Sequence, residues 1–355
     1  MRQKKKILVA PLNWGLGHAT RCIPVIKELQ RQGAEVFLAS DGRALELLKK
    51  EFPGLPALPL PAYNIKYRSK NIVLNMGREM PKLIRAVFSE KKTIKKYIKK
   101  YSLDGIVSDN RLGCFNKKTV TVFIGHQINL ILPFPFLQWA ARQINYYFIK
   151  KHNECWVPDV ANEPNLSGRL SHGTPIKNIQ YIGALSRFDF YETKKKYGAI
   201  AVLSGPEPQR TKLERRIIEQ AKKSTRRFLV VQGKTEKNEH FFIGKNIEVV
   251  SHLASEALNK NILASGLFIG RPGYSSIMDL AKLGRPALLV PTPGQTEQEY
   301  LGSRLSANGL FCVQAQEEIN LEKGMAGALE KGGLSARFFD AGKLEKAVSG
   351  FLAKL

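Results

Sequence analysis

The sequence predicts an α/β protein made of two Rossmann-like domains, each built on a parallel sheet, that face each other across a central cleft. Short apolar runs alternate with amphipathic helical segments, which is the pattern of β-α-β units. This alternation occurs in two separate series, and a chain of 355 residues with 43% hydrophobic content is long enough for two cored domains. Because such sheets bind ligands at the carboxyl ends of their strands, the cleft is the expected ligand site.

The expected elements follow one another in two groups. The first group has strands at 7–10, 36–39, 105–107 and 120–124 and helices at 19–31 and 43–51. The second group has strands at 199–203, 228–231, 247–250, 267–270 and 287–290. A polar, charged stretch separates the groups. The expected boundaries are therefore an N-terminal domain over 1–186, a linker over 187–198, a C-terminal domain over 199–335 and a final helix over 336–355, for which packing back on the N-terminal domain is one option.

The net charge of +26 is the strongest compositional signal. Such an excess attracts polyanions. Part of it lies in a segment where six lysines flank Ile94, Tyr97 and Ile98 at helical spacing: Lys91, Lys92, Lys95, Lys96, Lys99 and Lys100. This pattern is typical of a solvated basic face over an apolar seam, with an anionic membrane surface as the next interpretation. Nucleic acid is not an expected partner, because no nucleic-acid-binding motif accompanies the charge.

The cysteines and the longest apolar stretch bear on location. Four scattered cysteines predict a reduced, cytoplasmic chain without a metal site: Cys22, Cys114, Cys155 and Cys312. The stretch 130–141 is too short to span a bilayer. The segment 130–151 is rich in aromatic residues and ends on Lys150 and Lys151. It is either an ordinary core helix or a segment that binds the inner face of the membrane. A cytoplasmic protein is expected, and peripheral membrane binding stays open.

The loop after the first strand carries the candidate base. Gly15 and Gly17 allow a tight turn and close approach of another backbone. His18 follows them at the entry to a helix, where it faces the cleft. A neutral imidazole there can take a proton from an acceptor hydroxyl, or from water, as it attacks an anomeric carbon. The alternative is a histidine that only caps or packs the turn.

A second motif follows the strand at 267–270. Gly273, Ser275 and Ser276 are expected at a helix amino terminus, where free N–H groups and the helix dipole hold a diphosphate without a metal ion. Asp279, about one turn further, can accept hydrogen bonds from ribose hydroxyls. In the structural alternative Ser275 is only the N-cap and Asp279 only a favourable charge near the helix start. The next strand-to-helix loop carries polar groups that can fix sugar hydroxyls.

The chain resembles the family-28 glycosyltransferases, which have the GT-B fold, and in particular their peptidoglycan N-acetylglucosaminyltransferase branch. The resemblance spans most of the chain and is most specific from residue 270 to 305. A small-residue turn, an acid in the next helix, a Val-Pro strand end and a Gln-rich loop before Tyr300 follow that family's order. The resemblance implies a set of donor-binding residues: Gly205, Gln232, Gly233, Arg271, Gly273, Ser275, Ser276, Asp279, Gln298 and Glu299. Asp279 stands where the family usually has glutamate, and Glu299 stands where it has the second of two glutamines.

The acceptor side shows the same resemblance. The run from His126 to Asn129 is similar to the family's His-Glu-x-Asn motif, and His18 matches its catalytic base. The resemblance implies a set of acceptor-binding residues: Asn13, Gly15, Gly17, His126, Gln127 and Asn129. It also implies an inverting, metal-independent transferase without a cofactor, whose C-terminal domain binds a UDP-sugar donor. Its N-terminal domain would bind a hydroxyl acceptor, which in the branch named above is lipid-linked.

Two alternatives stay open. The run Gly17-His18-x-x-Arg21-Cys22 is also similar to the loop of GT-B-like nucleotide-sugar hydrolases, so water is an acceptor to consider. A nucleotide-sugar hydrolase or epimerase is therefore the first alternative, and it would consume its donor without any acceptor. The second is a nucleotide-sugar-binding protein without catalysis, since one histidine does not define a mechanism.

Overall fold

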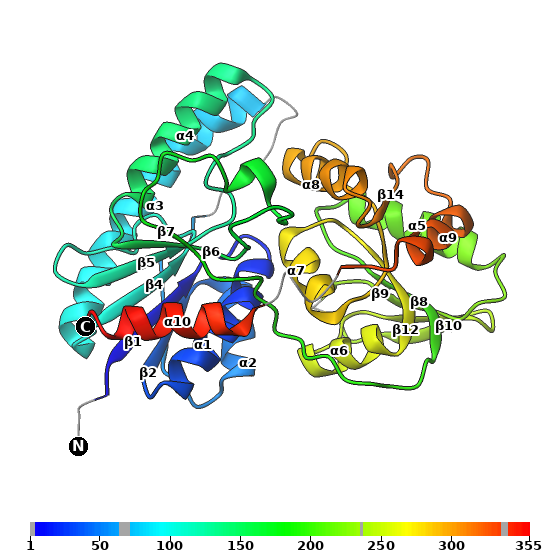
Figure 1. Ribbon diagram of the computed structural model, residues 1–355, viewed down its shortest axis with the longest axis horizontal. Coiled ribbons are helices and arrows are strands. Elements are labelled where there is room, and N and C mark those ends of the chain that lie inside the picture. Colours follow the sequence, from blue (N-terminus) through cyan, green and yellow to red (C-terminus); the bar gives the residue numbers. More distant parts are fainter. Residues whose placement is uncertain (1–3, 64–71, 235–236, 335–339) are drawn as a thin grey trace.

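The protein folds into two lobes (Figure 1). The computed structural model describes residues 4–63, 72–234, 237–334 and 340–355, and for 72–79 and 341 it describes the backbone only. Each lobe is built on a seven-stranded sheet. The α/β class and the two-sheet architecture are therefore confirmed.

The N-terminal sheet has the strand order β3-β2-β1-β4-β5-β6-β7, and its strands pair in parallel. The strands are β1 (Lys6–Pro11), β2 (Glu35–Ser40), β3 (Ala57–Pro59), β4 (Gly105–Asp109), β5 (Val120–Ile124), β6 (Glu154–Val157) and β7 (Ile179–Tyr181). The helices of this lobe are α1 (Gly17–Arg31), α2 (Gly42–Glu51), α3 (Ile72–Tyr101), α4 (Pro135–Ile149) and the short 3-10 helix η1 (Gly168–Leu170). The order places the carboxyl ends of β1, β4 and β5 beside one another, which is where such sheets bind ligands.

The C-terminal sheet has the order β10-β11-β9-β8-β12-β13-β14. Its strands are β8 (Tyr197–Val202), β9 (Phe228–Val231), β10 (His240–Ile243), β11 (Ile247–Val250), β12 (Ser265–Gly270), β13 (Ala287–Leu289) and β14 (Cys312–Val313). All pair in parallel except β10, which is antiparallel to β11. The helices are α5 (Gln209–Ala221), α6 (Ser255–Leu263), α7 (Tyr274–Leu283), α8 (Thr296–Ala307) and α9 (Leu321–Lys331).

Apolar runs form the central strands because helices cover both faces of each sheet. Ile7, Leu8 and Val9 are successive residues of β1, and all three are fully buried although they point to alternate faces. In α1, Ile23 and Ile26 recur at helical spacing and pack against the same sheet. The strands that the sequence pattern missed are β3, β6, β7, β10 and β14, each two to four residues long. Four of them, β3, β7, β10 and β14, are the edge strands of the two sheets, where burial on both faces is not required.

The last helix, α10 (Ala341–Leu352), lies on the N-terminal lobe, where it is drawn in red across α1 and β1 (Figure 1). Phe351 is fully buried and meets the ring of Trp156 edge to face, with 6.0 Å between centroids. Glu345 forms an ion pair with Arg31 of α1 at 2.8 Å. The chain therefore crosses between the lobes twice, once between β7 and β8 and once before α10.

Two helices on the surface of the N-terminal lobe, α3 and α4, contribute Val87 and Phe148 to one small apolar cluster. The six lysines of 91–100 are exposed, whereas Ile94 is buried with Tyr97 and Ile98 packed against it, as expected for a solvated basic face over an apolar seam. In α4 the core-helix interpretation is wrong, because only Tyr146 and Ile149 are buried. Within the described residues, no helix is both long and apolar enough to cross a bilayer.

Candidate active site

The imidazole of His18 is held by a carboxylate from the neighbouring strand. His18 is the second residue of α1, and Asp109 is the last residue of β4, directly beside Pro11 of β1. The His18 Nδ1 lies 2.8 Å from Asp109 Oδ1. Sequence analysis did not single out Asp109. The available signal was an acidic residue at the carboxyl end of a strand, where Rossmann-like sheets place functional groups.

Arg21 connects this pair to a second histidine. It lies one turn after His18 on α1, is buried, and donates hydrogen bonds to both carboxylate oxygens of Asp109. Its Nη1 lies 2.8 Å from Nδ1 of His126. Because a guanidinium only donates, Nδ1 of His126 is the acceptor and its proton is on Nε2. That Nε2 donates to Glu297 Oε1 at 2.7 Å, across the domain interface.

Asp109 and Arg21 make opposing demands on the tautomer of His18. A carboxylate only accepts, so Nδ1–H of His18 donates to Asp109 and Nε2 keeps its lone pair. Arg21 Nη2 also lies 2.8 Å from His18 Nδ1 and favours the opposite tautomer, because a guanidinium only donates. We assign the proton to Nδ1 because Asp109, at the same distance, is a fully buried, ionised carboxylate. A carboxylate that orients a histidine base in this way is the arrangement found in catalytic triads.

The charges of the site favour a neutral base beside an ionised acid. Burial and the Arg21 charge lower the pKa of His18 below 6.5, although Asp109 acts in the opposite direction. Burial opposes ionisation of Asp109, but Arg21 and then His18 outweigh it and lower its pKa to about 2. At neutral pH the site therefore holds a neutral imidazole on an anionic partner, which suits a general base.

The start of α7 faces the start of α1. Helix α7 begins at Tyr274 with Gly273 as its N-cap, and Ser275 Oγ donates to the carbonyl of Gly17 at 3.1 Å. A Cβ atom on Gly17 would lie 2.7 Å from Ser275 Oγ, so any larger residue there would force the Ser275 hydroxyl to move. The N-cap alternative for Ser275 is wrong. Gly273, Ser275 and Ser276 do stand at the amino end of α7, which is a site suited to anions.

Arg271 lies under this helix start. It is buried and donates to the carbonyls of Val290, Pro291 and Gln209 and to Gln316 Oε1. These bonds tie together the ends of β12 and β13 and the start of α5. Burial lowers the pKa of Arg271 to about 10, so the side chain remains a cation at neutral pH. It therefore adds positive charge below the expected diphosphate site.

The glycine loops of this domain have the backbone conformations that glycine allows. Gly205 has φ +103° and Gly233 has φ +73°. The side chain of Gln232 is buried and donates to Glu214, while its Oε1 has no hydrogen-bond partner. These residues lie after β8 and β9, at the carboxyl end of the second sheet.

Three of the residues predicted to bind the sugar donor already accept a hydrogen bond from within the protein through a side-chain oxygen. Gln298 Oε1 accepts from the Thr292 backbone at 2.9 Å, and Glu299 Oε1 accepts from the Gly294 backbone at 2.7 Å, so both shape the loop before α8. Asp279 Oδ1 accepts from Ser186 Oγ at 2.6 Å. Burial raises the pKa of Asp279 to about 6, against the opposing effects of Arg187 and Ser186. This contact joins α7 to the chain segment that connects the domains.

On the acceptor side, Asn13 is fixed in place. Its amide donates to Asp41 at 3.0 Å and accepts from the Ala44 backbone at 3.2 Å. Asp41 forms an ion pair with the buried Arg111 at 2.7 Å, and Arg111 also pairs with the buried Glu90. This network gives Asn13 a rigid support beside the first loop, in which Gly15 has φ +79°.

The three residues predicted for the acceptor site in the loop after β5 have different surroundings. His126 lies in the network with Arg21, and the carbonyl of Gln127 accepts from Asn145 at 3.1 Å. Asn129 is buried, donates to two backbone carbonyls and accepts from the Tyr146 hydroxyl. The Asn129 amide therefore stabilises this loop through contacts within the protein, whereas the motif implied a contact with the acceptor substrate.

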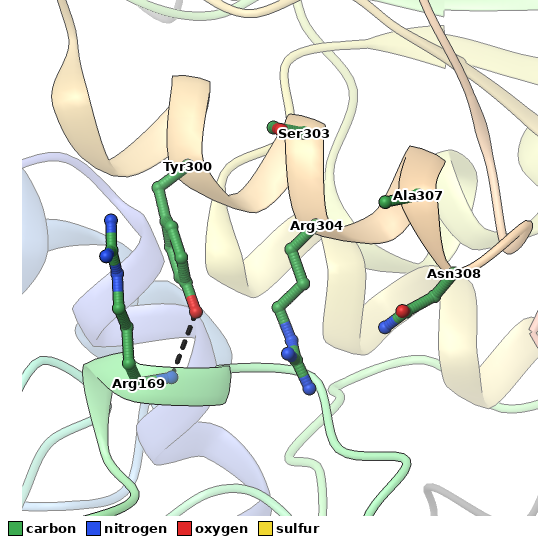
Figure 2. Close-up of a pocket in the computed structure, with 6 residues that line it drawn as sticks. All are labelled: Arg169, Tyr300, Ser303, Arg304, Ala307 and Asn308. Carbon is green, nitrogen blue, oxygen red and sulfur yellow. Dashed lines mark hydrogen bonds between the residues drawn. The ribbon is translucent and has the colours of Figure 1, made fainter.

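An open cavity of about 370 Å³ lies elsewhere on the domain interface, between η1 and α8 (Figure 2). It is lined by Arg169, Tyr300, Ser303, Arg304, Ala307 and Asn308. The hydroxyl of Tyr300 accepts from the Arg169 backbone at 2.9 Å. No residue predicted for the site lines this cavity.

Comparison with known proteins identifies related chains. Residues 200–335 match the model of the glycosyltransferase family 28 C-terminal domain. An uncharacterized glycosyltransferase of Methanosarcina acetivorans is 27% identical over 314 residues, covering 83% of this chain and 79% of that protein. A UDP-N-acetylglucosamine--N-acetylmuramyl-(pentapeptide) pyrophosphoryl-undecaprenol N-acetylglucosamine transferase of Methylobacterium radiotolerans is 33% identical over 61 residues, covering 17% of this chain and 16% of that protein.

The fold is similar to that of a solved glycosyltransferase. The structure of SnogD from Streptomyces nogalater aligns with a TM-score of 0.67 over 99% of this chain and all of that chain, at 14% identity. At this identity the likeness concerns the fold. It agrees with two parallel-sheet domains arranged as in GT-B glycosyltransferases.

Proposed function

We propose that this GT-B glycosyltransferase, whose second domain is a family 28 C-terminal domain, transfers a sugar from a UDP-sugar to a hydroxyl acceptor, with inversion and without a metal ion. One observation carries the proposal. The imidazole of His18 is anchored at Nδ1 by Asp109, and the residue before it, Gly17, contacts Ser275 at the amino end of α7.

The reaction we propose is a single displacement. His18 Nε2 takes the proton of the acceptor hydroxyl while the hydroxyl oxygen bonds to the anomeric carbon. The bond between that carbon and the diphosphate oxygen breaks with its electron pair, so the configuration inverts. The N–H groups at the start of α7 would stabilise the charge on the leaving diphosphate, and Asp109 would stabilise the imidazolium.

The lipid-linked acceptor is part of the same proposal. Four aromatic residues at and along α4 form an exposed surface, here named the aromatic surface: Phe134 (52% exposed), Phe136 (75%), Trp139 (59%) and Tyr147 (57%). Lys150 and Lys151 follow the helix, and the lysines of α3 lie on the same lobe. Aromatic side chains beside lysines suit the interface of an anionic leaflet, where a lipid-linked acceptor would be presented.

Nucleotide release from a donor panel tests the reaction. Purified wild type and His18→Ala would be incubated with UDP-, GDP-, TDP- and CMP-sugars, with and without a membrane-lipid extract. We expect release from a UDP-sugar that needs the extract and is lost in His18→Ala. A control variant, His240→Ala, removes an exposed histidine of β10 and should release nucleotide as wild type does. Release without extract would instead indicate a hydrolase, and release from no donor would contradict the proposal.

Vesicle flotation tests the membrane surface separately. We expect wild type to float with vesicles containing anionic lipid and Trp139→Ser or Phe136→Ser to float less. Phe242→Ser is the matched control, because Phe242 is 61% exposed but lies on β10 of the other domain. Equal flotation of all variants would contradict a role for the aromatic surface.

A further inference from the structure

His126 is held by two residues of the opposite domain. It follows β5 in the N-terminal domain and is nearly buried. The ring of Tyr274, the first residue of α7, stacks on it with 4.1 Å between centroids and 6° between planes. Glu297, in the first turn of α8, accepts its Nε2–H at 2.7 Å. The contact therefore exists only when the two domains meet.

The same histidine connects to the base. Glu297 accepts from His126, His126 accepts from Arg21, and Arg21 donates to Asp109, which accepts from His18. The direction of the hydrogen bonds at both ends of His126 is fixed, because a carboxylate only accepts and a guanidinium only donates. The position of the proton on His126 therefore affects the position of the proton on His18.

We propose that Glu297 is a positioning residue through which domain closure keeps the proton of His18 on Nδ1. The inference rests on the proposed role of His18 as the base. Nothing in the sequence motif assigned a role to Glu297, whose neighbours Gln298 and Glu299 were the predicted residues.

The consequence of losing Glu297 follows from the distances. Without an acceptor at Nε2, the proton of His126 can move to Nδ1, where it meets the Nη1–H of Arg21. Arg21 must then turn away from His126, and we expect its contact from Nη2 to His18 Nδ1, at 2.8 Å, to prevail over the contact of Asp109 with the same atom. That contact requires a lone pair on Nδ1 and moves the His18 proton to Nε2. The base would then present a proton, rather than a lone pair, to the acceptor.

Among the described residues, His18 interacts electrostatically with Asp109 on β4, Arg21 on α1, His126 after β5 and Glu297 on α8. Burial opposes ionisation of Glu297, but His126 and then Arg21 outweigh it and lower its pKa. The charges of Glu297 and His18 also interact. Removing the carboxylate should therefore lower the pKa of His18, in addition to changing its tautomer.

Histidine side-chain NMR is the first test. The chain has six histidines, so long-range proton–nitrogen spectra of histidine-labelled protein are simple. In wild type we expect Nδ1–H on His18 and Nε2–H on His126. Glu297→Ala should give mixed tautomers at both rings. Glu297→Gln should keep the wild-type tautomers, because its amide oxygen still accepts, which also guards against loss of folding in the alanine variant.

The matched control is a second ion pair between the same helix and the same domain. Arg304 of α8 pairs with the exposed Glu163 at 2.8 Å, away from His18. Glu163→Gln should therefore leave the spectra of His18 and His126 unchanged. Unchanged His18 signals in Glu297→Ala, or the same mixing in Glu163→Gln, would overturn the inference.

Kinetics provide the second test. Glu297→Ala should lower kcat about tenfold, a part of what general-base catalysis contributes, with the donor KM within about twofold of wild type. Glu297→Gln should recover most of kcat, with the acidic limb of its pH profile moved to lower pH. A kcat of Glu297→Ala equal to that of wild type would overturn the inference. If wild type releases no nucleotide, the proposed function fails, while the spectra still decide the role of Glu297.

Discussion

Asp109→Asn tests whether His18 acts as the base only when a carboxylate orients it. The carboxylate is fully buried, accepts from His18 at 2.8 Å and accepts twice from Arg21. An asparagine keeps the shape but replaces one oxygen by an NH2 group. That group must face a donor of His18 or Arg21, and Arg21 is left as a buried cation without its counterion. We therefore expect losses of both stability and rate.

The magnitudes follow from the buried ion pair. Removing one partner of such a pair costs about 3–5 kcal/mol, which corresponds to a fall in melting temperature of roughly 10 °C for a domain of this size. Loss of an oriented general base lowers kcat by about 10² to 10⁴. The ionisation of Asp109 itself contributes less, about 2 kcal/mol, because its pKa moves from 3.8 to about 2. Since the folded pKa is lowered, this part is present above pH 4 and is lost as the pH falls from about 4 to 2.

Thermal unfolding and nucleotide release would be measured on the same preparations, at a temperature where every variant is folded. Glu90→Gln is the control, because Glu90 is a buried carboxylate of the same domain that pairs with Arg111 rather than with Arg21. It should lose comparable stability and much less activity. An Asp109→Asn variant that releases nucleotide at the wild-type rate would refute the assignment of His18 and Asp109 as a catalytic pair.

Three further predictions concern packing and pH. Burial lowers the pKa of His152 to about 4, so as the pH falls the unfolded chain takes up this proton first, and the free energy of unfolding should fall by about 3 kcal/mol from pH 6.5 to 4. His152→Phe should abolish this pH dependence in urea unfolding, and an unchanged dependence would contradict the prediction. Gly17→Ala should raise the KM for the sugar donor because the new Cβ meets Ser275 Oγ, and adding Ser275→Ala should partly reverse the rise. An unchanged KM in Gly17→Ala would show that the starts of α1 and α7 separate during turnover. Burial raises the pKa of Asp279 to about 6, so the stability that its protonated form contributes is lost as the pH rises from about 4 through 6. Asp279→Asn should therefore gain stability relative to wild type over that range, and parallel curves of stability against pH would contradict this prediction.

The sequence predicted the parts of the site that are local. His18 and the start of α7 are recognisable because a strand, a glycine-containing turn and a helix follow one another within a few residues. Asp109 is 91 residues away from His18, and only the sheet order, which sets β4 beside β1, brings the two together. That order is a property of the whole domain. An acid at a strand end is a weak signal without it.

Helical phase explains the result in the loop before α8. Three polar residues occur in a row, Glu297, Gln298 and Glu299, and the resemblance favoured the last two. Because α8 begins at Thr296, successive side chains point about 100° apart. Gln298 turns inward to Thr292, Glu299 turns to Gly294, and Glu297 reaches His126. The start of a helix is the feature that a sequence pattern locates least well, so the phase could not be predicted.

The electrostatics of the cleft indicate what closes it. Helices α1 and α7 meet at their amino ends, and neither has an acidic residue in its first turn. Two positive helix ends therefore oppose each other, with the buried cation Arg271 just before α7. Like ends repel, so closure without an anion carries an electrostatic cost that a diphosphate would remove. Binding of the proposed donor should therefore favour the arrangement in which Glu297 reaches His126.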